Sequence, residues 1–192
     1  MTAMMEEARE LLPATAPSLC PPVYTARDYA KQMLIAGILL TIHNFEESLG
    51  FYWFKYPAWF QPPTWFPLAP PSNWEMITAI IIVTAIFWLA ITSVAVSKKL
   101  VIKRFMLTAF VMVFMINTWV PHILGSIVFL TYFPGVVTAV ILYLPAAYLM
   151  FPKLYKQFES RRTFLFTAAA AFGTALSWVG MAQGIAYIGF HI

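Results

Sequence analysis

Five long apolar stretches run through this chain of 192 residues, and they leave very few folds open. They cover 30–51, 74–97, 105–129, 134–151 and 164–190, and each is close to the roughly 20 residues that cross a bilayer as a helix. None alternates polar and apolar residues as a barrel strand does. Helices and closed barrels are the structures that satisfy their backbone groups inside lipid. We therefore predict an all-α, polytopic membrane protein with a bundle of five transmembrane helices.

The composition agrees with a protein that lies mainly in lipid. Charged residues make up 10% of the chain and hydrophobic residues 61%, whereas a soluble domain carries about a quarter charged residues. The sequence contains no Gly-rich phosphate loop and no nucleic-acid motif, so we expect no nucleic-acid partner. The single cysteine, Cys20, excludes an internal disulfide and a cysteine-based metal site.

Lysine and arginine residues gather on one side of the predicted bundle. They lie around the start of the first stretch, between the second and the third, and between the fourth and the fifth: Arg27, Lys31, Lys98, Lys99, Lys103, Arg104, Lys153, Lys156, Arg161 and Arg162. Only Lys55 falls on the other side. Since such residues collect in the cytoplasm, we predict a cytoplasmic N-terminus and a C-terminus outside.

The segments around the apolar stretches have distinct compositions. Residues 1–29 hold four acidic residues and four prolines without a clean apolar core, which predicts a cytoplasmic tail with a short helix over 2–12 rather than a signal peptide. Residues 30–192 form the predicted transmembrane domain. Its outer loop, 51–74, contains ten aromatic residues and six prolines, which indicates an aromatic belt at the headgroups and is compatible with a lid. Gly180 and Gly184 predict close helix packing within the bundle.

A polar cluster lies inside the first apolar stretch. His43, Glu46 and Glu47 are three and four residues apart, so they share one side of a helix. His43 lies 12 residues past Lys31, or about 18 Å, near or just past the bilayer midplane. A charged side chain there costs at least about 2.5–3.5 kcal/mol, and no Lys or Arg lies at that depth. The carboxylates therefore need a proton, an ion pair or a bound cation.

The third apolar stretch brings two more polar residues to the same depth. Asn117 lies 13 residues past Arg104, and His122 follows five residues later. On a straight helix these two side chains would point about 140° apart. Pro121 has no N–H to bond the carbonyl of Asn117, so we expect a bend that lets both side chains face one cavity.

Together these residues predict an intramembrane catalytic site made of His43, Glu46, Glu47, Asn117 and His122. Two imidazoles and two carboxylates suit zinc, iron or manganese, with His43, Glu46, Glu47 and His122 as the candidate metal ligands. Without a metal, a protonated glutamate beside a histidine suits the acid–base chemistry of an isomerase or cyclase. A proton or cation transporter and a purely structural polar network are further alternatives. Lesser candidates for the same cavity are Tyr132, Ser177, Trp178 and Gln183.

These motifs resemble a known family. An HxxEE pattern at 43–47 in the first predicted helix is followed by Asn117 and His122 and then by Phe133-Pro134-Gly135. In this order, over residues 31–151, the chain resembles the HXXEE-domain family of small integral membrane proteins, whose function is unknown. The arrangement is also similar in style to emopamil-binding sterol isomerases and to glutamate-type CAAX proteases. The EExxxR pattern of those proteases is missing, because Phe51 stands where the arginine would be.

The residues and the resemblance lead to one functional prediction. We expect a multi-pass, integral membrane enzyme that acts on a membrane lipid, an isoprenoid or another hydrophobic small molecule. The residues leave open whether it holds a divalent metal, and the family implies a membrane metalloenzyme only as a conjecture. The aromatic outer loop fits an apolar substrate.

Overall fold

The computed structural model describes residues 24–54 and 71–192, and in this part of the chain every regular element is helical. The all-α prediction is therefore confirmed. The predicted tail helix over 2–12, Cys20, and the central part of the aromatic loop lie outside the described residues. Five helical segments follow one another: α2 (Ala26–Trp53), α3 (Asn73–Val96), the interrupted helix α4–η1–α5 (Leu100–Asn117, Thr118–Ile123, Leu124–Phe129), the segment α6–η2–α7 (Val136–Thr138, Ala139–Tyr143, Leu144–Tyr155) and α8 (Arg161–His191).

Four of these segments are long and apolar enough to cross a membrane. They are Asn73–Val96, Leu100–Phe129, Val136–Tyr155 and Arg161–His191, and they coincide with the second to fifth predicted stretches. The remaining segment, α2, is 28 residues long, or about 42 Å, and it carries the polar cluster. The structure thus contains the five expected helical segments, while the crossing of the membrane by α2 and the orientation of the bundle stay predictions.

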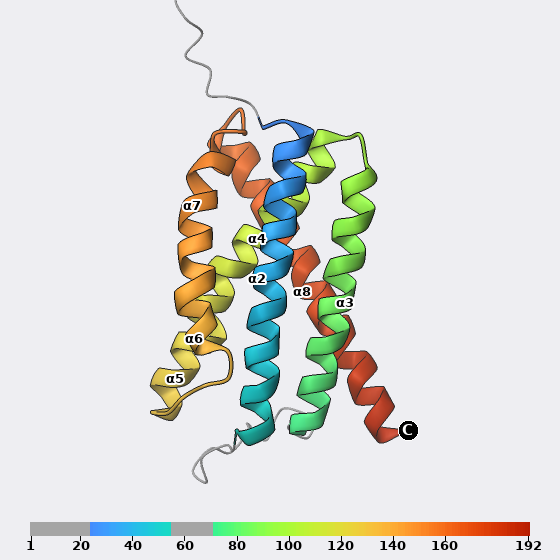
Figure 1. Ribbon diagram of the computed structural model, residues 1–192, viewed down its shortest axis with the longest axis vertical. Coiled ribbons are helices and arrows are strands. Elements are labelled where there is room, and N and C mark those ends of the chain that lie inside the picture. The colour runs from blue at the N-terminus through green and yellow to red at the C-terminus, as the bar shows by residue number, and fades with distance from the viewer. Residues whose placement is uncertain (1–23, 55–70) are drawn as a thin grey trace, which may run out of the picture.

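The helices alternate in direction, as Figure 1 shows. The start of α2, the α3–α4 connection and the α7–α8 connection all lie at the upper end of the view, and the C-terminus lies at the lower end. The basic residues of these three regions therefore share one end of the bundle. This is the arrangement on which the predicted cytoplasmic side was based.

Side-chain caps define where several helices begin. Thr25 and Asp28 form a reciprocal capping box at the start of α2, and Ser72 and Glu75 form a second one at the start of α3. The Ser160 side chain accepts from the backbone N–H of Thr163 at the start of α8.

The core is built from large side chains on the central helices and small ones on α8. Buried residues on α2 recur every three or four positions and pack with aromatic residues of α3, α4 and η2: Tyr29, Met33, Ala36, Leu40, Phe87, Phe110, Phe114 and Tyr143. The helix α8 packs against α3 and α4. Its buried positions are mostly alanine, which lets the backbones approach closely: Ala168, Ala171, Ala175, Ala182 and Ala186.

The glycines of α8 do not take part in this packing. A Cβ atom added at Gly180 or at Gly184 would meet no heavy atom of the described residues within 4 Å. The prediction that this glycine pair packs closely inside the bundle is therefore wrong. The reason is helical phase, because the alanines occupy the inward face of α8 and these glycines do not.

Candidate metal centre

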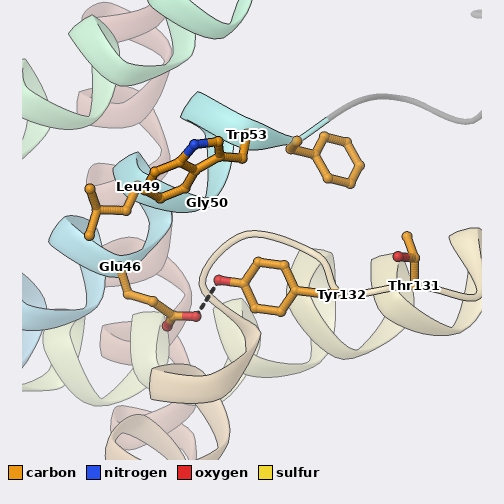
Figure 2. Close-up of a pocket in the computed structure, with 7 residues that line it drawn as sticks. Glu46, Leu49, Gly50, Trp53, Thr131 and Tyr132 are labelled. Atoms are coloured by element: carbon orange, nitrogen blue, oxygen red, sulfur yellow. Dashed lines mark hydrogen bonds between the residues drawn. The ribbon is translucent and has the colours of Figure 1, made fainter.

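The helix α2 presents its histidine and its two glutamates to different neighbours. His43 is completely buried, and its Nε2 atom lies 3.7 Å from Oε2 of Glu47, one turn further along the helix. Glu46 points toward the loop that precedes α6, where Tyr132 donates to its Oε1 atom at 2.5 Å (Figure 2). Adjacent residues on a helix differ by about 100° in direction, and this separates the two carboxylates.

The break between α4 and α5 brings Asn117 and His122 together. Val120 has φ −133° and ψ 112°, which is extended rather than helical backbone, and Pro121 follows it. Asn117 Nδ2 consequently lies 3.0 Å from Nε2 of His122 and 3.4 Å from Nε2 of His43. The predicted interruption is confirmed, and it removes the angular separation that a regular helix would impose.

A tight turn after α5 closes the site from the other side. His122 Nδ1 lies 2.7 Å from the carbonyl oxygen of Pro134, so Nδ1 carries the proton and donates it. Gly135 follows with φ 85°, a backbone conformation that glycine adopts without strain. A Cβ atom here would lie 2.6 Å from Cε1 of His122 and 2.9 Å from Cε1 of His43. Only glycine therefore lets this turn pack directly on both imidazoles.

Thr138 connects the second carboxylate to the first histidine. Its hydroxyl donates to Oε2 of Glu46 at 2.5 Å, and its backbone N–H donates to the same oxygen at 2.9 Å. With its proton committed to Glu46, the hydroxyl oxygen accepts from Nδ1 of His43 at 2.9 Å. Both histidines are thereby held with Nδ1 protonated, which leaves an Nε2 lone pair on each.

Tyr132 anchors the other oxygen of Glu46. Burial and the hydrogen bond to the Glu46 carboxylate raise the pKa of Tyr132 to about 12. The phenol is therefore protonated, and a donor, across the physiological range. With Thr138 and Tyr132 as donors, both oxygens of the Glu46 carboxylate accept hydrogen bonds.

The remaining ligand atoms converge into a group that suits a divalent metal. Ligand atoms of His43, Glu47 and His122 all lie within 4.8 Å of one another. Two neutral imidazoles and a carboxylate are a common set for a catalytic zinc site. The Nδ1 atoms of the two histidines are hydrogen-bonded, one to the Thr138 hydroxyl and the other to the backbone carbonyl of Pro134. Metal-binding histidines usually have such a partner on the nitrogen that does not bind the metal. Three of the four predicted ligands thus form the group, while Glu46 supports it through Thr138.

Two cavities flank the polar part of α2. One has a volume of about 410 Å³ and is lined by Glu46, Trp53, Phe54 and Tyr132 among others; Figure 2 shows it. The other has a volume of about 310 Å³ and is lined by Glu47, Asn117 and Tyr143 together with apolar residues of α3 and α8. The two adjacent glutamates therefore line different cavities.

Sequence reasoning missed two polar residues of this region, Thr138 and Tyr143. Each has apolar residues on both sides in the sequence, and no spacing or charge pattern distinguishes it. The lesser candidates have mixed placements. Tyr132 bonds Glu46, and Gln183 lines the 310 Å³ cavity. Trp178 packs on Phe87, whereas Ser177 is exposed and donates to its own helix.

Comparison with known proteins agrees with the motif. The family model described as "Protein of unknown function with HXXEE motif" matches residues 34–150, which include every residue of the metal group and of its hydrogen-bonded surroundings. No curated protein and no solved structure matches the chain. The matched region ends before α8.

Proposed function

The chain belongs to the HXXEE family, whose function is unknown, and from the site described above we propose that it is a membrane-embedded metalloenzyme. His43, Glu47 and His122 hold the metal in this proposal, and the substrate is a lipid-like or isoprenoid molecule. The observation that carries it is the convergence of three ligand side chains, two completely buried and one 14% exposed. An unpaired carboxylate at that depth is costly, and a bound cation removes the cost.

The side chains of the site divide into those that hold the metal and those that orient them. Thr138 and the carbonyl of Pro134 fix the protonation of the two imidazoles, so that each Nε2 is available as a ligand atom. Glu46 accepts the hydrogen bond of the Thr138 hydroxyl and is therefore a positioning residue. A divalent ion in this group supplies Lewis-acid polarisation of a carbonyl or of water. Asn117 lies close enough to both Nε2 atoms to orient a bound polar group.

Elemental analysis of the purified full-length protein tests this proposal. Wild-type protein in detergent is expected to hold about one equivalent of a divalent transition metal, and His122→Ala is expected to lose it. His191→Ala is the matched control, because this histidine lies at the end of α8 with a 3.3 Å contact to Glu75 and outside the group. A metal content far below one equivalent in the wild type, unchanged by His122→Ala, would overturn the metal-dependent function.

A metal-free acid–base enzyme is the second candidate, and one contact favours it. The Asn117 amide lies within hydrogen-bonding distance of both Nε2 atoms, so it can satisfy both imidazoles without an ion. In that case Glu47 acts as the proton donor or acceptor toward an isomerase or cyclase substrate. Asn117→Leu separates the two candidates. If the site holds no metal, this variant loses the amide that donates to both imidazoles, and the protein becomes less stable. If the site holds a metal, the variant keeps its metal content and its melting temperature.

A further inference from the structure

The 310 Å³ cavity contains a polar group that the proposed metal group does not use. Tyr143 is completely buried, and its hydroxyl has no hydrogen-bond partner among the residues that the structure describes. Its ring stacks on the Phe114 ring, with 4.1 Å between the ring centroids, and packs against the His43 ring, with 4.2 Å between the centroids. A buried hydroxyl without a partner is destabilising, and native proteins rarely keep one unless it has a role.

The surroundings of this hydroxyl are polar on one side and apolar on the other. Glu47, a member of the metal group, and Asn117, which lies beside the group, line the same cavity as Tyr143. From α3 the cavity is lined only by apolar side chains, among them Ile80, Val83 and Phe87. A volume of about 310 Å³ is at the lower end of small-molecule sites, which span about 300–1,000 Å³. The cavity therefore suits a single chain or a small ring system rather than a whole two-chain phospholipid.

We propose that this cavity is the substrate pocket, and that Tyr143 donates a hydrogen bond to a single oxygen atom on an otherwise apolar substrate. The inference rests on the proposed function and narrows its substrate class to a ketone, aldehyde or alcohol with a short hydrocarbon body. The oxygen satisfies the orphan hydroxyl of Tyr143 beside Glu47, and the hydrocarbon lies along α3. A pure hydrocarbon leaves the hydroxyl without a partner and binds more weakly.

Two ligands that differ in one heavy atom test whether Tyr143 donates a hydrogen bond to the substrate. Radiolabelled methyl decyl ketone carries a carbonyl oxygen that only accepts hydrogen bonds, and its methylidene isostere has the same shape with a =CH₂ group instead. Saturable binding of each is measured to the full-length protein in lipid nanodiscs. Because each probe is compared between protein variants, its partition into the bilayer cancels.

The variant Tyr143→Phe removes only the hydroxyl. We expect it to weaken ketone binding about tenfold, the size of one neutral hydrogen bond, and to leave binding of the isostere unchanged. Tyr148→Phe is the matched control, because this tyrosine lies on the same helical segment but is 78% exposed. It should alter neither probe. Since Tyr143→Phe removes an unpaired polar group, the melting temperature of this variant should equal or exceed that of the wild type.

The outcomes separate this inference from the proposed function. Equal ketone affinity for Tyr143→Phe and wild type, or no saturable ketone binding to either, would refute the pocket assignment even where the metal content is one equivalent. Conversely, selective loss of ketone binding in a protein without metal supports the pocket and removes the metal-dependent function. Unchanged metal content in Tyr143→Phe is the expected result, since this residue is not part of the metal group.

Discussion

The contact of Gly135 with both histidine rings gives a quantitative test of the site. Alanine at this position has to adopt φ 85°, which costs a residue with a Cβ atom about 1–2 kcal/mol. Its Cβ would also lie 2.6 Å from the His122 ring and 2.9 Å from the His43 ring. Overpacking of this kind costs about 1–3 kcal/mol. Together the two effects predict that Gly135→Ala loses about 2–5 kcal/mol of folding free energy.

Thermal unfolding and metal analysis of the same preparations measure this effect. A loss of that size corresponds to a fall in melting temperature of roughly 4–20 °C for a chain of this length. The displaced imidazoles should also reduce metal content, which a general loss of stability would not do in the protein that remains folded. Gly173→Ala is the control, because a Cβ atom there meets no heavy atom within 4 Å in the described part of the chain. In the interior of α8 it should stabilise by about 0.5–1 kcal/mol. A Gly135→Ala protein with wild-type melting temperature and metal content would show that the turn does not pack on the histidines.

Three further perturbations test other contacts. Thr138→Val removes the hydroxyl between Glu46 and His43 and should weaken metal affinity about 10–100-fold in a chelator competition assay. Thr138→Ser keeps a hydroxyl and should have the metal affinity of the wild type. Equal affinities for the wild type and both variants would contradict the role of the hydroxyl. The Tyr132 phenol has its pKa raised from 10.0 to about 12 by burial and by its contact with Glu46. Its stabilising effect is therefore complete below pH 10 and is lost as the pH rises through about 12. The tyrosinate absorbance that Tyr132→Phe removes should titrate near 12, and a midpoint near 10 would refute the contact. Lys103, which is buried and donates from Nζ to the carbonyl of Ala95 at 2.8 Å, should lower stability by about 1–3 kcal/mol when changed to methionine. The same change at the exposed Lys98 should have no effect on the unfolding transition, and equal stability of the two variants would argue against the buried contact.

Local properties of the sequence are enough to predict the helices and the polar residues that they carry. Apolar length and charge placement are local properties, so the bounds of four membrane-length helices follow from them, with the largest difference at the start of the third, 105 against 100. The helical period put His43 and Glu47 one turn apart, and the missing N–H of Pro121 marked the break before His122. These inferences needed no knowledge of neighbouring helices. The predicted topology also put the polar residues of the first and third helices at one depth in the membrane.

Which side chains contact one another depends on how the helices and the turn between them pack. The two glutamates are equivalent in sequence terms, but the docking of the turn 131–135 and of α6 against α2 engages Glu46 and leaves Glu47 beside His43. Thr138, Gly135 and the carbonyl of Pro134 act on the histidines only because that turn folds back over them. The separations of these contacts along the chain range from 12 positions for His122 and Pro134 to 95 for His43 and Thr138. No local period or composition encodes them, because they arise from how separate helices pack.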